Sequence, residues 1–125
     1  MKAKTQMLAA TAMAIVASAA SAQELTVWDW KSGDPAAYGY IEKATELFEA
    51  AHPGVEVRFV MQPNDQYYTL LGTALSSNAG PDVFLMNGGA QAQARFDALA
   101  DVTALADGLV GTEEFSDADG TVYAL

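Results

Sequence analysis

Apolar and polar residues follow strand and helix periods along most of the chain. Leu25–Asp29 and Val55–Met61 are rich in β-forming residues and predict strands. The second segment alternates, with apolar side chains on one face and Glu56 and Arg58 on the other, as in an edge strand with one wet face. Val83–Met86 is a continuous apolar run, which is typical of a central parallel strand covered on both faces.

Apolar residues recur at helical spacing between these strands. Ala37–Ala51 predicts an amphipathic helix that ends at His52–Gly54, since a residue before proline disfavours helical geometry. A second helix follows Asn64 or Asp65, and either residue is expected to cap it. The first apolar stripe is Ile41, Ala44, Leu47, Phe48 and Ala51, with Glu42, Lys43, Glu46 and Glu49 mostly opposite. The second stripe is Tyr67, Leu70, Leu71, Ala74 and Leu75.

The remainder of the chain is less regular. A weaker helix is predicted over Ala90–Leu99, a short helical piece over Ala104–Leu109, and a further strand over Thr121–Leu125 after a turn at Asp119–Gly120. The order βαβαβα predicts an α/β fold with a parallel sheet flanked by helices. Because only three or four strands are available and the last one reaches the final residue, we expect a fragment.

Three predicted loops leave the carboxyl ends of the strands. They are Trp30–Tyr38, Gln62–Gln66 and Asn87–Gln91. Ligands of open parallel sheets bind outside this edge, so these loops are the first place to seek a binding site.

The first residues predict a secretory signal peptide. Lys2 and Lys4 precede an apolar run, Met7–Ala20, and a small-residue cleavage site ends at Ala22 before the polar Gln23. The run has 14 residues, whereas about 20 are needed to span a bilayer, which disfavours a membrane anchor. We therefore expect residues 1–22 to be removed and residues 23–125 to be soluble in the periplasm.

Composition excludes several classes of function. The absence of cysteine excludes disulfides, thiolate metal sites and a cysteine nucleophile, and the single histidine, His52, makes a zinc site of the usual type unavailable. The net charge of −10 becomes −12 when Lys2 and Lys4 are removed, and this field repels nucleic acid. No phosphate-binding glycine motif is present, so no cofactor is expected. The acidity alternatively serves only to keep a secreted protein soluble.

Five segments in order resemble one protein family. They are LTVWDW, FEAAHPGVEVRF, PDVFLMNGG, ADVTAL and DGTVYAL, and together they resemble the N-terminal part of bacterial extracellular solute-binding proteins of family 1, many of which bind sugars. The resemblance implies a two-lobed fold of the periplasmic-binding-protein type II class, closing on a small-molecule ligand and docking as a monomer on ABC permease subunits in the inner membrane. Family members are several times longer, so residues 23–125 would form only an incomplete first lobe.

The predicted loops supply candidate ligand contacts. Sugar sites combine aromatic faces with fixed polar groups, which points to Trp28, Trp30, Asp34, Tyr38, Asn64 and Asn87. Simpler roles compete at several positions: Trp28 in core packing, Asn64 in helix capping, and Gly88–Gly89 in a turn. Tyr67 and Tyr68 are interpreted as core residues.

Other functions remain open at this stage. Acidic clusters facing aromatic residues suit polyamines, and paired tyrosines such as Tyr67–Tyr68 suit ferric iron. A glycoside hydrolase would need a carboxylate pair, for which Asp29 and Asp34 are the natural choice. A truncated product without activity is a further alternative.

Overall fold

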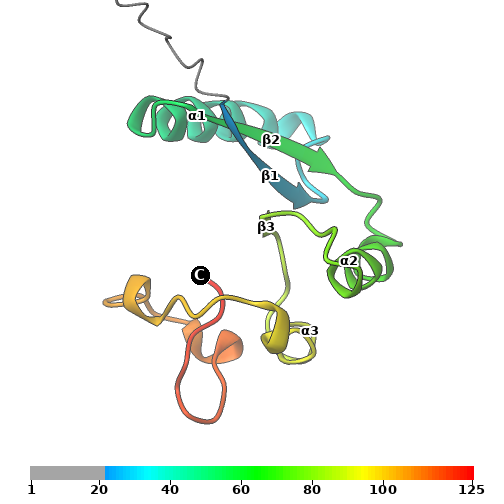
Figure 1. Ribbon diagram of the computed structural model, residues 1–125, viewed down its shortest axis with the longest axis vertical. Helices are drawn as coiled ribbons and strands as arrows, with labels where there is room; N and C mark the ends of the chain where they lie inside the picture. The colour runs from blue at the N-terminus through cyan, green and yellow to red at the C-terminus, as the bar shows by residue number, and fades with distance from the viewer. Residues whose placement is uncertain (1–21) are drawn as a thin grey trace, which may run out of the picture.

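The computed structural model describes residues 22–125 of the chain (Figure 1). The predicted signal peptide lies outside the described residues, apart from Ala22 at its end. The strands are β1 (Gln23–Asp29), β2 (Val55–Met61) and β3 (Val83–Phe84), and the α-helices are α1 (Pro35–Ala51), α2 (Tyr67–Ser76) and α3 (Ala90–Gln93). Short 3-10 helices cover Phe96–Ala98, Thr103–Leu105 and Thr112–Phe115. The predicted α/β order is confirmed.

The three strands form a parallel sheet in the order β2-β1-β3. Strands β1 and β2 pair over their whole length, from Gln23 opposite Val55 to Asp29 opposite Met61. Strand β2 is an edge strand, as its alternating pattern predicts. The crossovers β1-α1-β2 and β2-α2-β3 run in opposite directions across the sheet, and right-handed connections therefore place α1 and α2 on opposite faces.

Strand β3 differs from its predicted central position. It pairs with β1 only at Val83 and Phe84, and within residues 22–125 no strand pairs with its other side. Val83 is consequently 47% exposed and Leu85 is 40% exposed. The central strand is β1, which pairs with β2 on one side and with β3 on the other.

The predicted C-terminal strand is also absent from the sheet. Thr121–Leu125 contributes only an isolated antiparallel bridge between Ser116 and Val122. The turn that joins them is held by Asp117, whose carboxylate Oδ1 accepts hydrogen bonds from the N–H groups of Asp119 and Thr121. These local bonds satisfy the backbone without a partner in the sheet.

Helix α1 begins where the sequence supplies a capping residue. The Asp34 carboxylate accepts a hydrogen bond of 2.9 Å from the Ala36 N–H, and Pro35 occupies the first helical position. A proline there sacrifices no intrahelical bond, and its fixed φ suits a helix. The helix therefore starts two residues before the predicted Ala37 and ends at the predicted stop.

The face that α1 turns to the sheet differs from the predicted apolar stripe. Leu47, placed in that stripe, is 59% exposed. Glu49, placed on the opposite face, instead accepts a 2.8 Å hydrogen bond from the Val57 N–H. Because β2 is an edge strand, this bond satisfies an amide that the ladder with β1 leaves free. The half-buried positions of α1 recur at a spacing of four: Ala37, Ile41, Thr45 and Glu49.

Helix α2 begins without the predicted side-chain cap. Its N-cap residue is Gln66, whose side chain makes no capping bond, while Asn64 and Asp65 are exposed in a preceding backbone turn. The predicted apolar stripe is confirmed, since Tyr67 and Leu71 are fully buried. Packing against the sheet therefore fixes α2 more than capping does.

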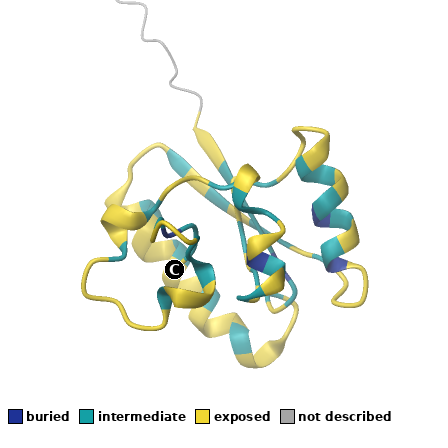
Figure 2. Cartoon of the chain, turned by 90° about the horizontal axis from the view of Figure 1, so that it is seen from below, coloured by how far each residue is buried: buried dark blue, intermediate teal, exposed yellow. Residues whose placement is uncertain are grey.

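The buried positions are few and concentrate where helices meet other elements (Figure 2). The buried apolar residues are Tyr67, Leu71, Ala92 and Val122, and the buried charged residue is Asp29. No helix among residues 22–125 combines the length and the apolar character needed to cross a membrane.

Candidate functional site

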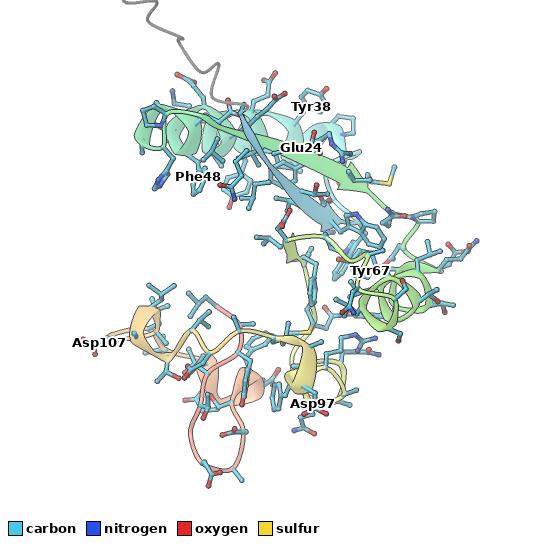
Figure 3. The ribbon with its side chains drawn as sticks, viewed as in Figure 1. Glu24, Tyr38, Phe48, Tyr67, Asp97 and Asp107 are labelled. Carbon is cyan, nitrogen blue, oxygen red and sulfur yellow. The ribbon has the colours of Figure 1, made fainter. Side chains whose placement is uncertain are left out.

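The site is set by the order of the strands. In a 2-1-3 sheet the chain turns to opposite sides after β1 and after β3, so a topological switch point lies between the carboxyl ends of these two strands. At such a point the loops diverge and leave room for a ligand. Helix α2 brings two tyrosines to this place, and Figure 3 shows Tyr67 close to the end of β1.

Tyr67 joins the two strands at the switch point. Its hydroxyl lies 3.0 Å from the carbonyl oxygen of Trp28 in β1 and 2.8 Å from that of Leu85 after β3. One hydroxyl carries one proton, so the two carbonyls share a single donor. The ladder between β1 and β3 is only two residue pairs long, and this contact continues the connection beyond it.

Three aromatic rings gather beside this contact. The ring of Trp30 meets the ring of Tyr67 edge to face, with centroids 4.7 Å apart, and lies 6.2 Å from the ring of Tyr68. The rings of Tyr67 and Tyr68 are also perpendicular, at 5.3 Å. Edge-to-face packing of this kind stabilises aromatic pairs beyond the area they bury. Trp30 and Tyr68 stay partly exposed, so the group presents aromatic surface to solvent.

The side chain of Arg95 and the backbone N–H of Asn87 also contact these aromatic side chains. The guanidinium carbon of Arg95 lies 4.7 Å from the centroid of the Tyr68 ring, a cation–π distance. The hydroxyl of Tyr68 accepts a 2.8 Å hydrogen bond from the Asn87 N–H. We call Trp30, Tyr67, Tyr68, Asn87 and Arg95 the switch-point cluster.

Asp29 holds the loop that follows β1 through hydrogen bonds to its backbone. Its carboxylate Oδ1 accepts hydrogen bonds from the N–H groups of Lys31 and Ser32, and its backbone carbonyl accepts one of 2.7 Å from Gln62 N. The residue is 5% exposed, and its second carboxylate oxygen has no hydrogen-bond partner among the described residues. Asp29 thus ties the loop that carries Trp30 to the end of β2.

Burial is the main cause that raises the pKa of Tyr67 far above its ordinary value. The neighbouring Tyr68 and the carboxylate of Asp29 raise the pKa further, because both disfavour a phenolate. Tyr67 is therefore a neutral hydrogen-bond donor at physiological pH.

The structure brings together only some of the predicted site residues. Trp30 and Asn87 belong to the switch-point cluster and are linked through Tyr68. Trp28 lies half-buried in β1, and its carbonyl oxygen is used by Tyr67. Asn64 is exposed in the turn before α2.

Asp34 and Tyr38 lie on the α1 side of the sheet. Asp34 caps that helix, and Tyr38 is 59% exposed, on the other side of β1 from Tyr67 in Figure 3. Tyr38 lines an open groove of about 720 Å³ between α1 and β2, together with Ile41, Phe59 and Met61 among others. Ser32 and Gly33 of the loop after β1 also line this groove, whereas no residue of the switch-point cluster does.

Sequence reasoning missed three members of the arrangement. Tyr67 and Tyr68 are both predicted core residues, and of the two only Tyr67 is fully buried. Nothing in the sequence pattern points to Arg95. Two adjacent tyrosines directly after the predicted loop Gln62–Gln66 are a sequence signal for an aromatic site at this edge of the sheet. The position of Arg95 has no such signal, because it depends on how the chain folds back after β3.

The two glycines of the third loop are required for different reasons. A Cβ on Gly88 would lie 2.5 Å from a carboxylate oxygen of Glu114, so this position lets the C-terminal segment approach. Gly89 has open space around it, but its positive φ of 62° favours glycine, which supports its role in the turn. Within residues 22–125 no group of three acidic or histidine side chains is placed to hold a metal ion.

Comparison with known proteins agrees with this architecture. Two solved structures share the fold, each 22% identical in sequence. One was described in work on xylan utilization by the thermophilic bacterium Caldanaerobius polysaccharolyticus. Its TM-score is 0.67, and the alignment covers 80% of this chain and 27% of the other protein. The other is a probable secreted solute-binding lipoprotein from Streptomyces coelicolor. Its TM-score is 0.64, and the alignment covers 82% of this chain and 28% of the other protein.

The chain spans little more than a quarter of the length of these two proteins. No curated protein matches it. The family described as bacterial extracellular solute-binding protein matches residues 28–123, which include the last two residues of β1, strands β2 and β3, helices α1, α2 and α3, and the switch-point cluster. The chain therefore belongs to the bacterial extracellular solute-binding protein family.

Proposed function

We propose that this chain is part of the solute-binding component of an ABC importer and that its ligand is a sugar or a related polyol. The observation that carries the proposal is the switch-point cluster itself: partly exposed aromatic rings lie at the carboxyl ends of β1 and β3 in a member of a solute-binding family.

The chemistry of the cluster suits a sugar. The apolar face of a pyranose packs on an aromatic ring, and Trp30 offers one in the loop that Asp29 holds in place. The exposed amide of Asn87 can both donate to and accept from hydroxyl groups. The Caldanaerobius neighbour was described in connection with xylan utilization, which makes xylo-oligosaccharides the first ligands to test.

The proposal includes export and docking. After export directed by residues 1–22, the protein works as a monomer in the periplasm and delivers its ligand to permease subunits in the inner membrane. The net charge, −10 for the whole chain and −12 without Lys2 and Lys4, is compatible with a neutral ligand and unfavourable for nucleic acid.

Alanine substitution of Trp30 or Asn87 tests the site. In the protein as its gene encodes it, each change should weaken sugar binding by more than about tenfold, because each removes a contact in a partly desolvated cluster. Calorimetry with xylobiose, maltose and sorbitol measures the affinity. Tyr40→Ala is the control, since Tyr40 is 77% exposed on α1. Unchanged affinity in both site variants would reject the assignment.

The same calorimetry separates the other binding functions. Putrescine binding without sugar binding would favour a polyamine carrier. A ferric site built on Tyr67 and Tyr68 is disfavoured, because iron binds the phenolate and the pKa of Tyr67 is raised by burial.

The hydrolase alternative has less support in the geometry. Both proposed carboxylates have structural partners: Asp29 holds loop amides and Asp34 caps α1. Turnover of a chromogenic glycoside would nevertheless overturn a function limited to binding.

A further inference from the structure

The hydroxyl group of Tyr68 accepts a hydrogen bond but does not donate one to another described residue. Its hydroxyl oxygen accepts the Asn87 N–H at 2.8 Å, which leaves the hydroxyl proton free to be donated. Among residues 22–125, the structure shows no acceptor for this proton. The residue is only half-buried, so the donor can reach a bound molecule.

The ring that carries this hydroxyl is held on several sides. Tyr67 packs against it at 89° with centroids 5.3 Å apart, and Arg95 lies over it at 4.7 Å. Arg95 is itself anchored, since one guanidinium nitrogen donates to the backbone oxygen of Gln91 at 2.6 Å and to its side-chain oxygen at 2.8 Å. A donor fixed before binding loses little conformational entropy when the ligand arrives.

We propose that Tyr68 orients the ligand by donating its hydroxyl proton to the oxygen of one hydroxyl group of the sugar while it holds the third loop through the Asn87 N–H. The inference rests on the proposed function and deepens it by assigning a specificity-determining contact. Accepting the amide hydrogen bond polarises the hydroxyl and strengthens its donation, because hydrogen bonds in a chain reinforce one another. The favoured ligand therefore presents an acceptor oxygen beside the ring of Trp30.

Tyr68→Phe tests this role in the protein as its gene encodes it. The change keeps the ring and its packing, and removes only the hydroxyl. We expect binding of the panel sugar that the unaltered protein prefers, among xylobiose, maltose and sorbitol, to weaken by about tenfold. Tyr123→Phe is the matched control, because the Tyr123 hydroxyl bonds to Asp117 at 3.1 Å, away from the switch point. Its affinity should equal that of the unaltered protein.

Monodeoxy analogues of the same sugar separate orientation from packing. If Tyr68 donates to one hydroxyl group, one analogue binds the unaltered protein and Tyr68→Phe equally well, while the others still show the tenfold difference. An equal loss with every analogue, accompanied by a lower melting temperature, would overturn the inference, as would an unchanged affinity for the parent sugar. If the variant fails to fold, a sugar complex of the unaltered protein decides by whether a sugar oxygen lies within about 3 Å of the Tyr68 hydroxyl.

The two proposals fail in different ways. An unaltered protein that binds no sugar in the panel overturns the proposed function and this inference with it. An unaltered protein that binds sugar, together with a Tyr68→Phe variant that binds equally well, overturns only the role of Tyr68.

Discussion

At the residue scale, the two adjacent tyrosines of α2 have different structural roles. Tyr67 is fully buried and joins two strands through its hydroxyl, while Tyr68 is partly exposed and contacts Asn87. The helical period predicts the burial of Tyr67 correctly. It cannot predict the acceptors, because the carbonyls of Trp28 and Leu85 lie 39 and 18 residues away in the chain. Contacts of this kind arise only when the sheet has formed.

Tyr67→Phe should lower the free energy of unfolding by about 1 kcal/mol, because the part-buried carbonyl of Leu85 loses its donor, while the carbonyl of Trp28 keeps the Leu85 N–H. Urea unfolding of the protein as its gene encodes it measures the change. Tyr38→Phe is the control, since Tyr38 is 59% exposed, and it should change stability by less than about 0.5 kcal/mol. Equal stabilities of the Tyr67 variant and the unaltered protein would show that the hydroxyl contributes nothing.

At the element scale, the pattern of apolar residues predicts element type well and packing face less well. The bounds of β2 are those predicted, and α1 ends where the proline predicts. The predicted packing face of α1 is wrong, because Thr45 and Glu49 lie toward the sheet, where the Glu49 carboxylate accepts a hydrogen bond from the edge strand β2. Hydrophobic periodicity has no means of recognising a polar residue that is needed to satisfy a backbone amide.

The length of β3 shows the same limit. An apolar run predicts burial on both faces, but burial needs neighbours, and among residues 22–125 β3 has a partner on one side only. Its pairing with β1 covers two residues, and the remaining apolar positions of the run, Leu85 and Met86, are exposed and half-buried.

Asp34 provides a test at this scale. Asp34→Ala removes the cap of α1 and should destabilise the protein by about 1 kcal/mol, whereas Asp34→Asn keeps an acceptor for the Ala36 N–H and should cost much less. Thermal unfolding of both variants measures the difference. Equal destabilisation by the two substitutions would contradict a capping role. A loss of sugar affinity in Asp34→Asn without loss of stability would instead support the predicted ligand contact.

At the scale of the whole molecule, strand order decides which predicted residues meet. The order 2-1-3 places the switch point between β1 and β3, and this brings Trp30, Tyr68 and Asn87 together from three separate segments. Sequence reasoning located the rim loops but had no access to strand order, so it could not separate Trp30 and Asn87 from Tyr38, which faces the groove beside α1. Family membership and fold agree with the segments recognised in the sequence.

The position of a bound sugar tests the central claim most directly. We predict that a crystal structure of the protein, as its gene encodes it, with the sugar it binds best will show a pyranose ring in contact with the indole of Trp30, at about 4 Å, beside the carboxyl ends of β1 and β3. A sugar bound instead in the groove between α1 and β2, without contact to Trp30, would contradict the account.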